Sequence, residues 1–380
     1  MTQEHPGHPV KGPGNTVPGR ESAERAEPSL LAGGSSPDAT PPLAVWALTP
    51  QGVRLARGLA RELQGEVFAP RRFAAPGEQG FASLTEAVAA AFHARPGHLF
   101  VAACGIVVRA VAPLLQGKAK DPAVVVLDQA GRFAVSLLSG HLGGANDLAR
   151  RAAAFTGGQA VITTATDVEG LPSLDLLARD SGLAIGNLEA VRAVNAGLLE
   201  GKSVQLFDPS GLLTVPPAHA GRFEWVAAQH LMDPGRPCVA VTWSTSPLPP
   251  GCLALRPRVV AAGVGCRRGT SAAEILEAIE AACALRRVSP ASVAVLASIE
   301  AKRDEAGLIE AARALGAELA FLPAARLAGV AVPNPSAQAF KHMGVESVCE
   351  AAALLTSGSD KLLLPKFKTR AVTVALALAV

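Results

Sequence analysis

The sequence has no tyrosine, and aromatic residues make up only 4% of its 380 positions. Proteins that bind nucleic acid by stacking bases need exposed aromatic rings, so this composition disfavours such a surface. An excess of one charge is also missing, because the net charge of +3 is too small to favour nucleic acid or an anionic membrane. Hydrophobic residues reach 49% against 18% charged, as expected of a globular chain with two or three cores.

Paired cysteine motifs and long apolar runs are missing as well. The six cysteines form no CxxC pair, and no histidine follows a pair at zinc-finger spacing, so we expect no protein-bound metal. Scattered free thiols favour a reducing cytoplasm. The apolar run at residues 371–380 is too short to cross a membrane, and the N-terminus lacks a signal-peptide pattern. We therefore expect a cytoplasmic protein that uses neither a membrane nor nucleic acid.

Alternating strand-like and helix-like runs predict an α/β fold: two α/β domains with mixed or mainly parallel sheets, joined by a smaller middle module. Residues 1–42 are rich in Pro, Gly, Ser and Glu and are expected to form a disordered tail. We place the N-terminal α/β domain at 43–167, the middle module or connector at 168–257 and the C-terminal α/β domain at 258–380. The middle module is expected to hold two helices and a strand, with no distinctive chemistry.

The stretch at residues 139–146, which reads SGHLGGAN, joins a predicted strand at 133–138 to a predicted helix at 145–154. Its three glycines permit a tight turn and a close approach to a ligand. The first amides of the helix favour a negative charge, and His141 adds a titratable group at the bend. These features indicate a site for an anionic or oxygen-rich ligand. A tight turn with a polar surface histidine would give the same pattern.

A second polar group, formed by Thr164, Thr166 and Asp167, follows the predicted strand at 160–163. It fits a ligand site or a helix N-cap equally well. If Asp167 lies beside His141, it could hold the neutral imidazole of His141 in the tautomer that takes a proton from water. The amides of the loop's glycines could then stabilise an oxyanion. That chemistry suits ester or lactone hydrolysis, and the lack of a GxSxG motif disfavours a serine esterase. Binding without catalysis stays open.

The C-terminal domain carries its own glycine loop at residues 263–270, GVGCRRGT. It lacks the lysine of a Walker A loop, and Arg268 stands where a dinucleotide fingerprint needs its third glycine. Arg267 and Arg268 instead offer bidentate hydrogen bonds to carboxylates or phosphates. Cys266 precedes a helix and is interpreted as a packing or substrate-contact residue in preference to a nucleophile.

Gly105 and Arg109 follow another predicted strand, at 99–103, where ligands of parallel sheets gather. Together with the glycine loops and the basic residues in both halves of the chain, they indicate a site for a small molecule that carries several negative charges.

Several of these stretches together resemble one protein family. Residues 105–115 (GIVVRAVAPLL), 120–126 (KDPAVVV), 137–146 (LLSGHLGGAN) and 161–167 (VITTATD) are similar to the amino-terminal part of the CbiG family of cobalamin biosynthesis. Residues 263–270, 297–305 (ASIEAKRDE) and the ending from Lys366 onward are similar to its carboxy-terminal part. The likeness runs in the family's order over roughly residues 43–380. Arg303 stands where a smaller residue is expected, and the tail has no counterpart.

The resemblance implies hydrolysis of cobalt-precorrin-5A, in which the δ-lactone of a tetrapyrrole macrocycle opens and a two-carbon fragment leaves as acetaldehyde. This polycarboxylate corrinoid brings its own cobalt, so the resemblance implies no cofactor and no metal held by the protein. His141 and Asp167 are expected to be catalytic, an inference from the residues and not from the family. The residues expected to bind the substrate are Gly105, Arg109, Gly140, Gly143, Gly144, Asn146, Thr164, Thr166, Gly265, Cys266, Arg267, Arg268, Gly269, Thr270, Ser298, Lys302 and Lys366.

A non-catalytic protein that binds or channels corrinoid intermediates in the same pathway would present the same loops. The sequence also leaves open whether the chain forms a homodimer and whether it contacts other cobalamin-pathway enzymes.

Overall fold

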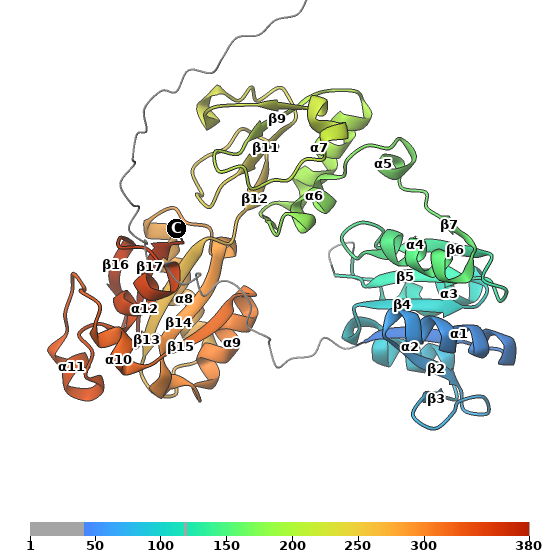
Figure 1. The fold of residues 1–380 in the computed structure, drawn as a ribbon, viewed down its shortest axis with the longest axis horizontal. Coiled ribbons are helices and arrows are strands. Elements are labelled where there is room, and N and C mark those ends of the chain that lie inside the picture. Colours follow the sequence, from blue (N-terminus) through green and yellow to red (C-terminus); the bar gives the residue numbers. More distant parts are fainter. Residues whose placement is uncertain (1–41, 118–119, 380) are drawn as a thin grey trace, which may run out of the picture. The chain divides into compact units, whose positions relative to one another are not determined.

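The computed structural model describes residues 42–117 and 120–379. Except for Pro42, the predicted tail lies outside the described residues. The strands form three separate sheets, which define an N-terminal, a middle and a C-terminal module (Figure 1). The predicted α/β class is confirmed. Among the described residues, no helix is long and apolar enough to cross a membrane.

The N-terminal module is built on a seven-stranded sheet in the order β3-β2-β1-β4-β5-β6-β7. Its strands are β1 (Leu43–Ala47), β2 (Gly65–Pro70), β3 (Gln79–Phe81), β4 (Gly97–Val101), β5 (Ala123–Leu127), β6 (Phe133–Leu138) and β7 (Gln159–Val161). Its helices are α1 (Pro50–Leu63), α2 (Leu84–Ala91), α3 (Cys104–Val111) and α4 (Ala145–Thr156). The predicted bounds of β6 agree with the structure.

Helices cover both faces of this sheet. On one face, α1 and α4 pack against the strands through residues such as Leu59 and Leu148. On the other face, α2 and α3 contribute Val88 and Val107 to a cluster around the fully buried Trp46. Burial on both faces explains the near-continuous apolar runs of β4 and β5 in the sequence.

The direction of β6 decides where the loop at residues 139–146 lies. Strands β1 to β5 run parallel to one another, whereas β6 runs antiparallel to β5, with Val124 opposite Leu138. The chain therefore leaves β6 at the edge of the sheet where β5 begins. β7 runs parallel to β6 and ends at the same edge. The start of α3, after β4, lies at the opposite edge, one five-residue strand away, or about 16 Å.

His98 in β4 gives this module a pH-dependent stability. It is fully buried, Trp46 Nε1 donates to its Nδ1 at 3.1 Å, and its Nε2 lies 3.0 Å from the carbonyl of Phe92. Burial lowers the pKa of His98 to about 4. Because the unfolded chain takes up this proton near pH 6.5, stability is lost as the pH falls from 6.5 towards 4, by about 3 kcal/mol. Urea unfolding should show a shallower pH dependence for His98→Gln than for the wild type, and equal slopes would contradict this assignment.

The middle module has a five-stranded sheet in the order β10-β9-β11-β12-β8. Its strands are β8 (Ala184–Ile185), β9 (Val204–Phe207), β10 (Phe223–Trp225), β11 (Cys238–Val241) and β12 (Leu253–Arg256), and its helices are α6 (Leu174–Asp180) and α7 (Leu188–Leu199). The short helix α5 (Ala165–Val168) precedes α6. The expectation of a single strand is wrong, because strands of two to four residues between loops leave no readable alternation in the sequence.

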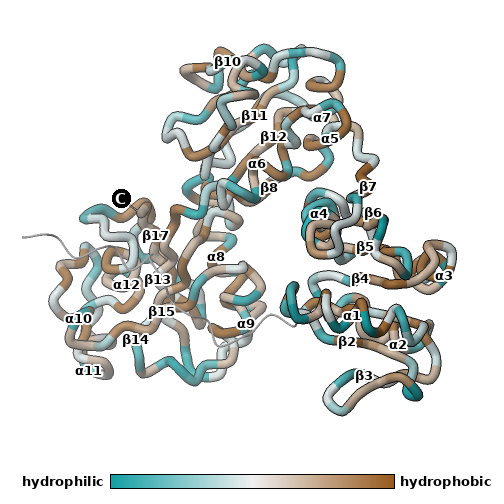
Figure 2. Tube along the Cα trace, turned by 45° about the vertical axis from the view of Figure 1, so that its right-hand side comes forward, coloured by the Kyte–Doolittle hydropathy of each residue, from teal (hydrophilic) through white to brown (hydrophobic). Residues whose placement is uncertain are grey.

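The C-terminal module has a five-stranded sheet in the order β15-β14-β13-β17-β16. Its strands are β13 (Val260–Cys266), β14 (Val293–Ile299), β15 (Glu318–Leu322), β16 (Leu362–Lys368) and β17 (Val372–Leu378). Its helices are α8 (Ala272–Leu285), α9 (Ala306–Leu315), α10 (Ala324–Ala328), α11 (Ala337–Met343) and α12 (Val348–Ser357). Helices α8 and α9 cover one face, and α10 and α12 pack on the other. Figure 2 shows the hydrophobic colouring of the central strand β13.

Candidate active site

The loop between β6 and α4 folds back on itself. The amides of Ala145 and Asn146 donate to the carbonyls of Ser139 and Gly140 at 3.1 and 3.0 Å. A Cβ on Gly143 would lie 2.3 Å from the Cβ of Ser139, so this glycine is required by the loop's own packing. The amide of Gly144 donates to the carbonyl of His141 at 2.9 Å and is therefore engaged, which corrects its predicted role in stabilising an oxyanion.

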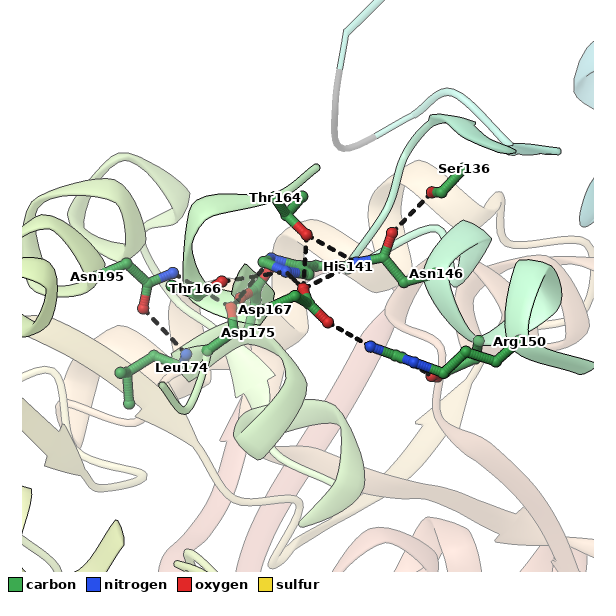
Figure 3. Close-up of polar contacts among 12 residues, drawn as sticks. Ser136, His141, Asn146, Arg150, Thr164, Thr166, Asp167, Leu174, Asp175 and Asn195 are labelled. Atoms are coloured by element: carbon green, nitrogen blue, oxygen red, sulfur yellow. Dashed lines mark hydrogen bonds and ion pairs between the residues drawn. The ribbon is translucent and has the colours of Figure 1, made fainter. Parts of the chain in front are cut away.

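This loop presents His141 to two carboxylates (Figure 3). The ring atom Nε2 lies 2.9 Å from Oδ2 of Asp167, and Nδ1 lies 3.5 Å from Oδ2 of Asp175. The hydroxyl of Ser173 lies 3.1 Å from Nδ1 and donates to Asp175. The side chain of His141 is 16% exposed, and those of Asp167 and Asp175 are 14% and 8% exposed. The imidazole is thus held on both of its nitrogens while one edge still reaches solvent.

Asp167 is fixed by donors from the N-terminal module. Its Oδ2 accepts hydrogen bonds from Thr164 Oγ1 at 2.6 Å and from Asn146 Nδ2 at 3.0 Å, and its Oδ1 pairs with Arg150. Asn146 is buried, and its own Oδ1 accepts from Ser136 Oγ at 2.7 Å. Thr164 and Asn146, predicted to bind substrate, therefore position the carboxylate that faces His141.

These contacts set the charges of the site. The hydrogen bond to Asp175, and then the one to Asp167, raise the pKa of His141 above its ordinary value, although partial burial opposes them. Burial alone would raise the pKa of Asp167, but hydrogen bonds from Thr164, His141 and Arg150 outweigh it and lower that pKa. His141 also helps to hold the pKa of Asp175 below its usual range, against the effect of burial. The two carboxylates thus favour the protonated form of His141, whereas the sequence suggested a neutral base.

Gly105 and Arg109 lie at the opposite edge of the N-terminal sheet from His141, so the structure does not bring these predicted site residues together. Both belong to the exposed part of α3, and Arg109 Nη1 donates to the carbonyl of Gly105 at 2.9 Å. The sequence pattern placed them at a strand end correctly. It did not show that the hairpin of β5 and β6 places the loop at residues 139–146 at the edge of the sheet opposite the start of α3.

In the C-terminal module, the predicted loop at 263–270 begins only at Arg267, because Gly265 and Cys266 belong to β13. Burial raises the pKa of the Cys266 thiol, which argues further against a nucleophile. Thr270 and Ser298 are buried, and their hydroxyls donate to the carbonyls of Arg267 and Val264 at 2.8 and 2.7 Å. Both hydroxyl protons are thus used inside the protein, and the contact of these two residues with a substrate stays a prediction.

The other predicted residues of this module divide between a charged cluster around Glu305 and a pocket. Lys302 pairs with Glu305 at 3.0 Å, and Glu305 also accepts from the amide of Gly269 at 2.9 Å. Arg268 is 93% exposed. Lys366, in contrast, lines a pocket together with Gly265, Cys266 and Arg267.

Three family models match most of the described chain from residue 86 onward. The family models for the cobalamin synthesis G N-terminal, the cobalamin biosynthesis central region and the cobalamin synthesis G C-terminus match residues 86–167, 172–257 and 260–377. A Priestia megaterium protein named cobalt-precorrin-5A hydrolase is 35% identical over 353 residues, which cover 88% of this chain and 94% of the relative. The chain belongs to the CbiG family.

A second relative agrees with this assignment. A Salmonella typhimurium protein, also named cobalt-precorrin-5A hydrolase, is 33% identical over 89% of this chain and 97% of its own length. A crystal structure of a cobalamin biosynthesis protein G homolog from Sulfolobus solfataricus covers 89% of this chain and 97% of that chain, at 19% identity and a TM-score of 0.38. The family resemblance predicted from the motifs is confirmed.

Sequence reasoning missed the second carboxylate of this CbiG site. Asp175 lies in the first turn of α6, and Ser173 precedes that helix. Asn195 from α7 supports them, since its side chain donates to Ser173 Oγ at 3.3 Å and accepts from the amide of Leu174 at 3.1 Å. A serine before a helix and an aspartate in its first turn are ordinary helix-start signals, so nothing local pointed to His141.

Proposed function

We propose that this CbiG protein is a cobalt-precorrin-5A hydrolase, an enzyme that opens the δ-lactone of its substrate and releases acetaldehyde. Two relatives of that name cover nearly the whole chain. The structural observation that carries the proposal is the partly exposed His141 held between Asp167 and Asp175. Such a group can give a proton to a leaving oxygen, which lactone opening requires.

The reaction has two stages with a simple balance. Water adds to the lactone carbonyl and loses a proton to solvent, and the bond from the carbonyl carbon to the ring oxygen breaks, which leaves a carboxylate and an alcohol. The alcohol then loses its proton, its carbon–oxygen bond becomes the carbonyl of acetaldehyde, and the carbon–carbon bond to the macrocycle breaks. The released electron pair and a proton end on the macrocycle.

His141 suits both stages. In the first, the imidazolium donates its proton to the departing ring oxygen, and its charge stabilises the oxyanion that precedes departure. In the second, the imidazole left behind takes the proton of the new hydroxyl and becomes an imidazolium again. Asp167 and Asp175 favour the protonated ring and fix its orientation in both stages.

The nature of the proposed substrate also bears on which cofactors and charged groups the protein itself must provide. Cobalt arrives inside the macrocycle, so we infer that the enzyme requires no cofactor and no metal of its own. The carboxylates of the macrocycle call for basic groups on the protein. The six cysteines are free thiols, which supports a cytoplasmic location.

Anaerobic incubation of the full-length protein with cobalt-precorrin-5A tests this function. Mass spectrometry should show the lactone converted to cobalt-precorrin-5B, with acetaldehyde trapped as its hydrazone in equal amount. In ¹⁸O-labelled water, the new carboxylate should carry one labelled oxygen. An intact lactone on tightly bound pigment would instead indicate a corrinoid carrier.

A further inference from the structure

A pocket of about 380 Å³ lies at the carboxyl end of β13 in the C-terminal module. β13 is the central strand of its sheet, with β14 parallel on one side and β17 antiparallel on the other. The pocket is lined by Gly265, Cys266 and Arg267 from this strand end, by Ser336, by Ser347, Val348 and Cys349 at the start of α12, and by Lys366 and residues 368–373 from the β16–β17 hairpin. Strand ends at such positions are where α/β sheets bind ligands.

The charges around this pocket have one sign. Its described lining contains the cations of Arg267, Lys366, Lys368 and Arg370 and no aspartate or glutamate. The nearby carboxylate of Glu350 is fully buried, and the amide of Lys366 donates to it at 2.9 Å. Glu350 therefore holds the strand and does not face a ligand.

The start of α12 adds to this positive field. Ser347 is the N-cap residue, and its side chain makes no capping hydrogen bond. The ten-residue helix is held tightly against β13, because a Cβ on Gly263 would lie 1.9 Å from the carbonyl oxygen of Cys349. The positive end of the helix is thus fixed beside the four cations, where it favours an anion.

We propose that this pocket binds carboxylate side chains of the corrinoid substrate, with Arg267, Lys366, Lys368 and Arg370 as the binding groups and the start of α12 as a further contact. This inference rests on the proposed function for the identity of the ligand. The proposed set of cations keeps Arg267 and Lys366 from the sequence prediction. It adds Lys368 and Arg370 and leaves out Arg268. The role of the pocket is affinity, since it contains no group placed for the lactone chemistry assigned to His141.

Charge reversal in the full-length protein tests the proposal. Lys368→Glu with Arg370→Glu reverses two pocket cations. Lys361→Glu with Arg286→Glu makes the same change of net charge at exposed positions outside the pocket lining. Binding is followed by fluorescence titration with uroporphyrin, a polycarboxylate porphyrin, and with protoporphyrin, which has fewer carboxylates.

The pocket variant should bind uroporphyrin at least tenfold more weakly than the wild type, because it loses charge-assisted hydrogen bonds. The control should stay within twofold, and protoporphyrin should respond less than uroporphyrin. Equal effects of the two double variants would overturn the proposal. If circular dichroism shows that the pocket variant is unfolded, Lys368→Gln with Arg370→Gln is titrated instead, and wild-type affinity in that variant overturns the proposal equally.

Turnover separates this proposal from the proposed function. With cobalt-precorrin-5A, the pocket variant should raise KM and leave kcat near the wild-type value. Weaker porphyrin binding without any turnover in the wild type would support the pocket and reject the hydrolase. Normal turnover with an unchanged KM in the pocket variant would reject the pocket and keep the hydrolase.

Discussion

Replacing His141 with alanine is expected to lower the rate of lactone opening by a hundredfold or more. The variant loses the proton donor that faces Asp167 and Asp175, and general acid catalysis is typically worth this much. Binding of the pigment should persist, because the cations of the C-terminal pocket are untouched. Single-turnover quench experiments with excess enzyme measure the lactone and the acetaldehyde separately from binding.

A matched control for this variant is His93→Ala. His93 lies in the same module, is exposed, and has its Nε2 3.0 Å from the carbonyl of Leu114 and 3.3 Å from Nε2 of Gln116. Its replacement should leave the rate unchanged. A His141→Ala protein that opens the lactone at the wild-type rate would make His141 a spectator and remove the catalytic role proposed for it.

Gly263→Ala is expected to unfold the C-terminal module or destabilise it by more than about 3 kcal/mol. The added Cβ would meet the carbonyl oxygen of Cys349 at 1.9 Å and the amide nitrogen of Ala353 at 2.7 Å. Both are backbone atoms of α12, so no side-chain rotation relieves the contact. Urea denaturation of the full-length protein measures the loss.

Gly269→Ala supplies the comparison, because Gly269 stands in the same sequence motif. A Cβ there meets nothing within 4 Å, and the only obstacle is a positive φ of 73°. The expected loss is about 1–2 kcal/mol. A Gly263→Ala protein as stable as Gly269→Ala would show that α12 does not approach β13 as closely as described.

The sequence predicted the scaffold of the His141 site better than its chemistry. The glycine loop and the Thr164–Asp167 segment were both assigned to strand ends, and the contact between His141 and Asp167 is present at 2.9 Å. Their catalytic role remains a prediction. Asp175 could not be foreseen, because its contact with His141 depends on how the chain returns after α5. Without Asp175, the sequence suggested a neutral imidazole, whereas two carboxylates favour a protonated one.

Glycine patterns were the least reliable signal. The sequence analysis counted Gly263 as part of a glycine loop, yet it lies in strand β13 and its missing side chain admits helix α12. Ser298 was also expected to bind the substrate, but it is buried and its hydroxyl donates to the carbonyl of Val264. In both cases a local motif defines a close contact, and only the tertiary structure shows whether the partner is a ligand or the protein itself.

The most direct test of catalysis by a protonated His141 pairs two pH titrations. One follows the ring ¹⁵N chemical shifts of His141, assigned with His141→Gln, and the other follows kcat. Because the two carboxylates raise the pKa of His141, its ring should keep its proton to a higher pH than an ordinary histidine, and activity should fall as the pH rises through that pKa. Asp175→Asn removes the largest cause of the raised pKa and should move both midpoints together to lower pH. A ¹⁵N midpoint below that of an ordinary histidine, or an activity midpoint that stays fixed while the ¹⁵N midpoint moves, would contradict this role.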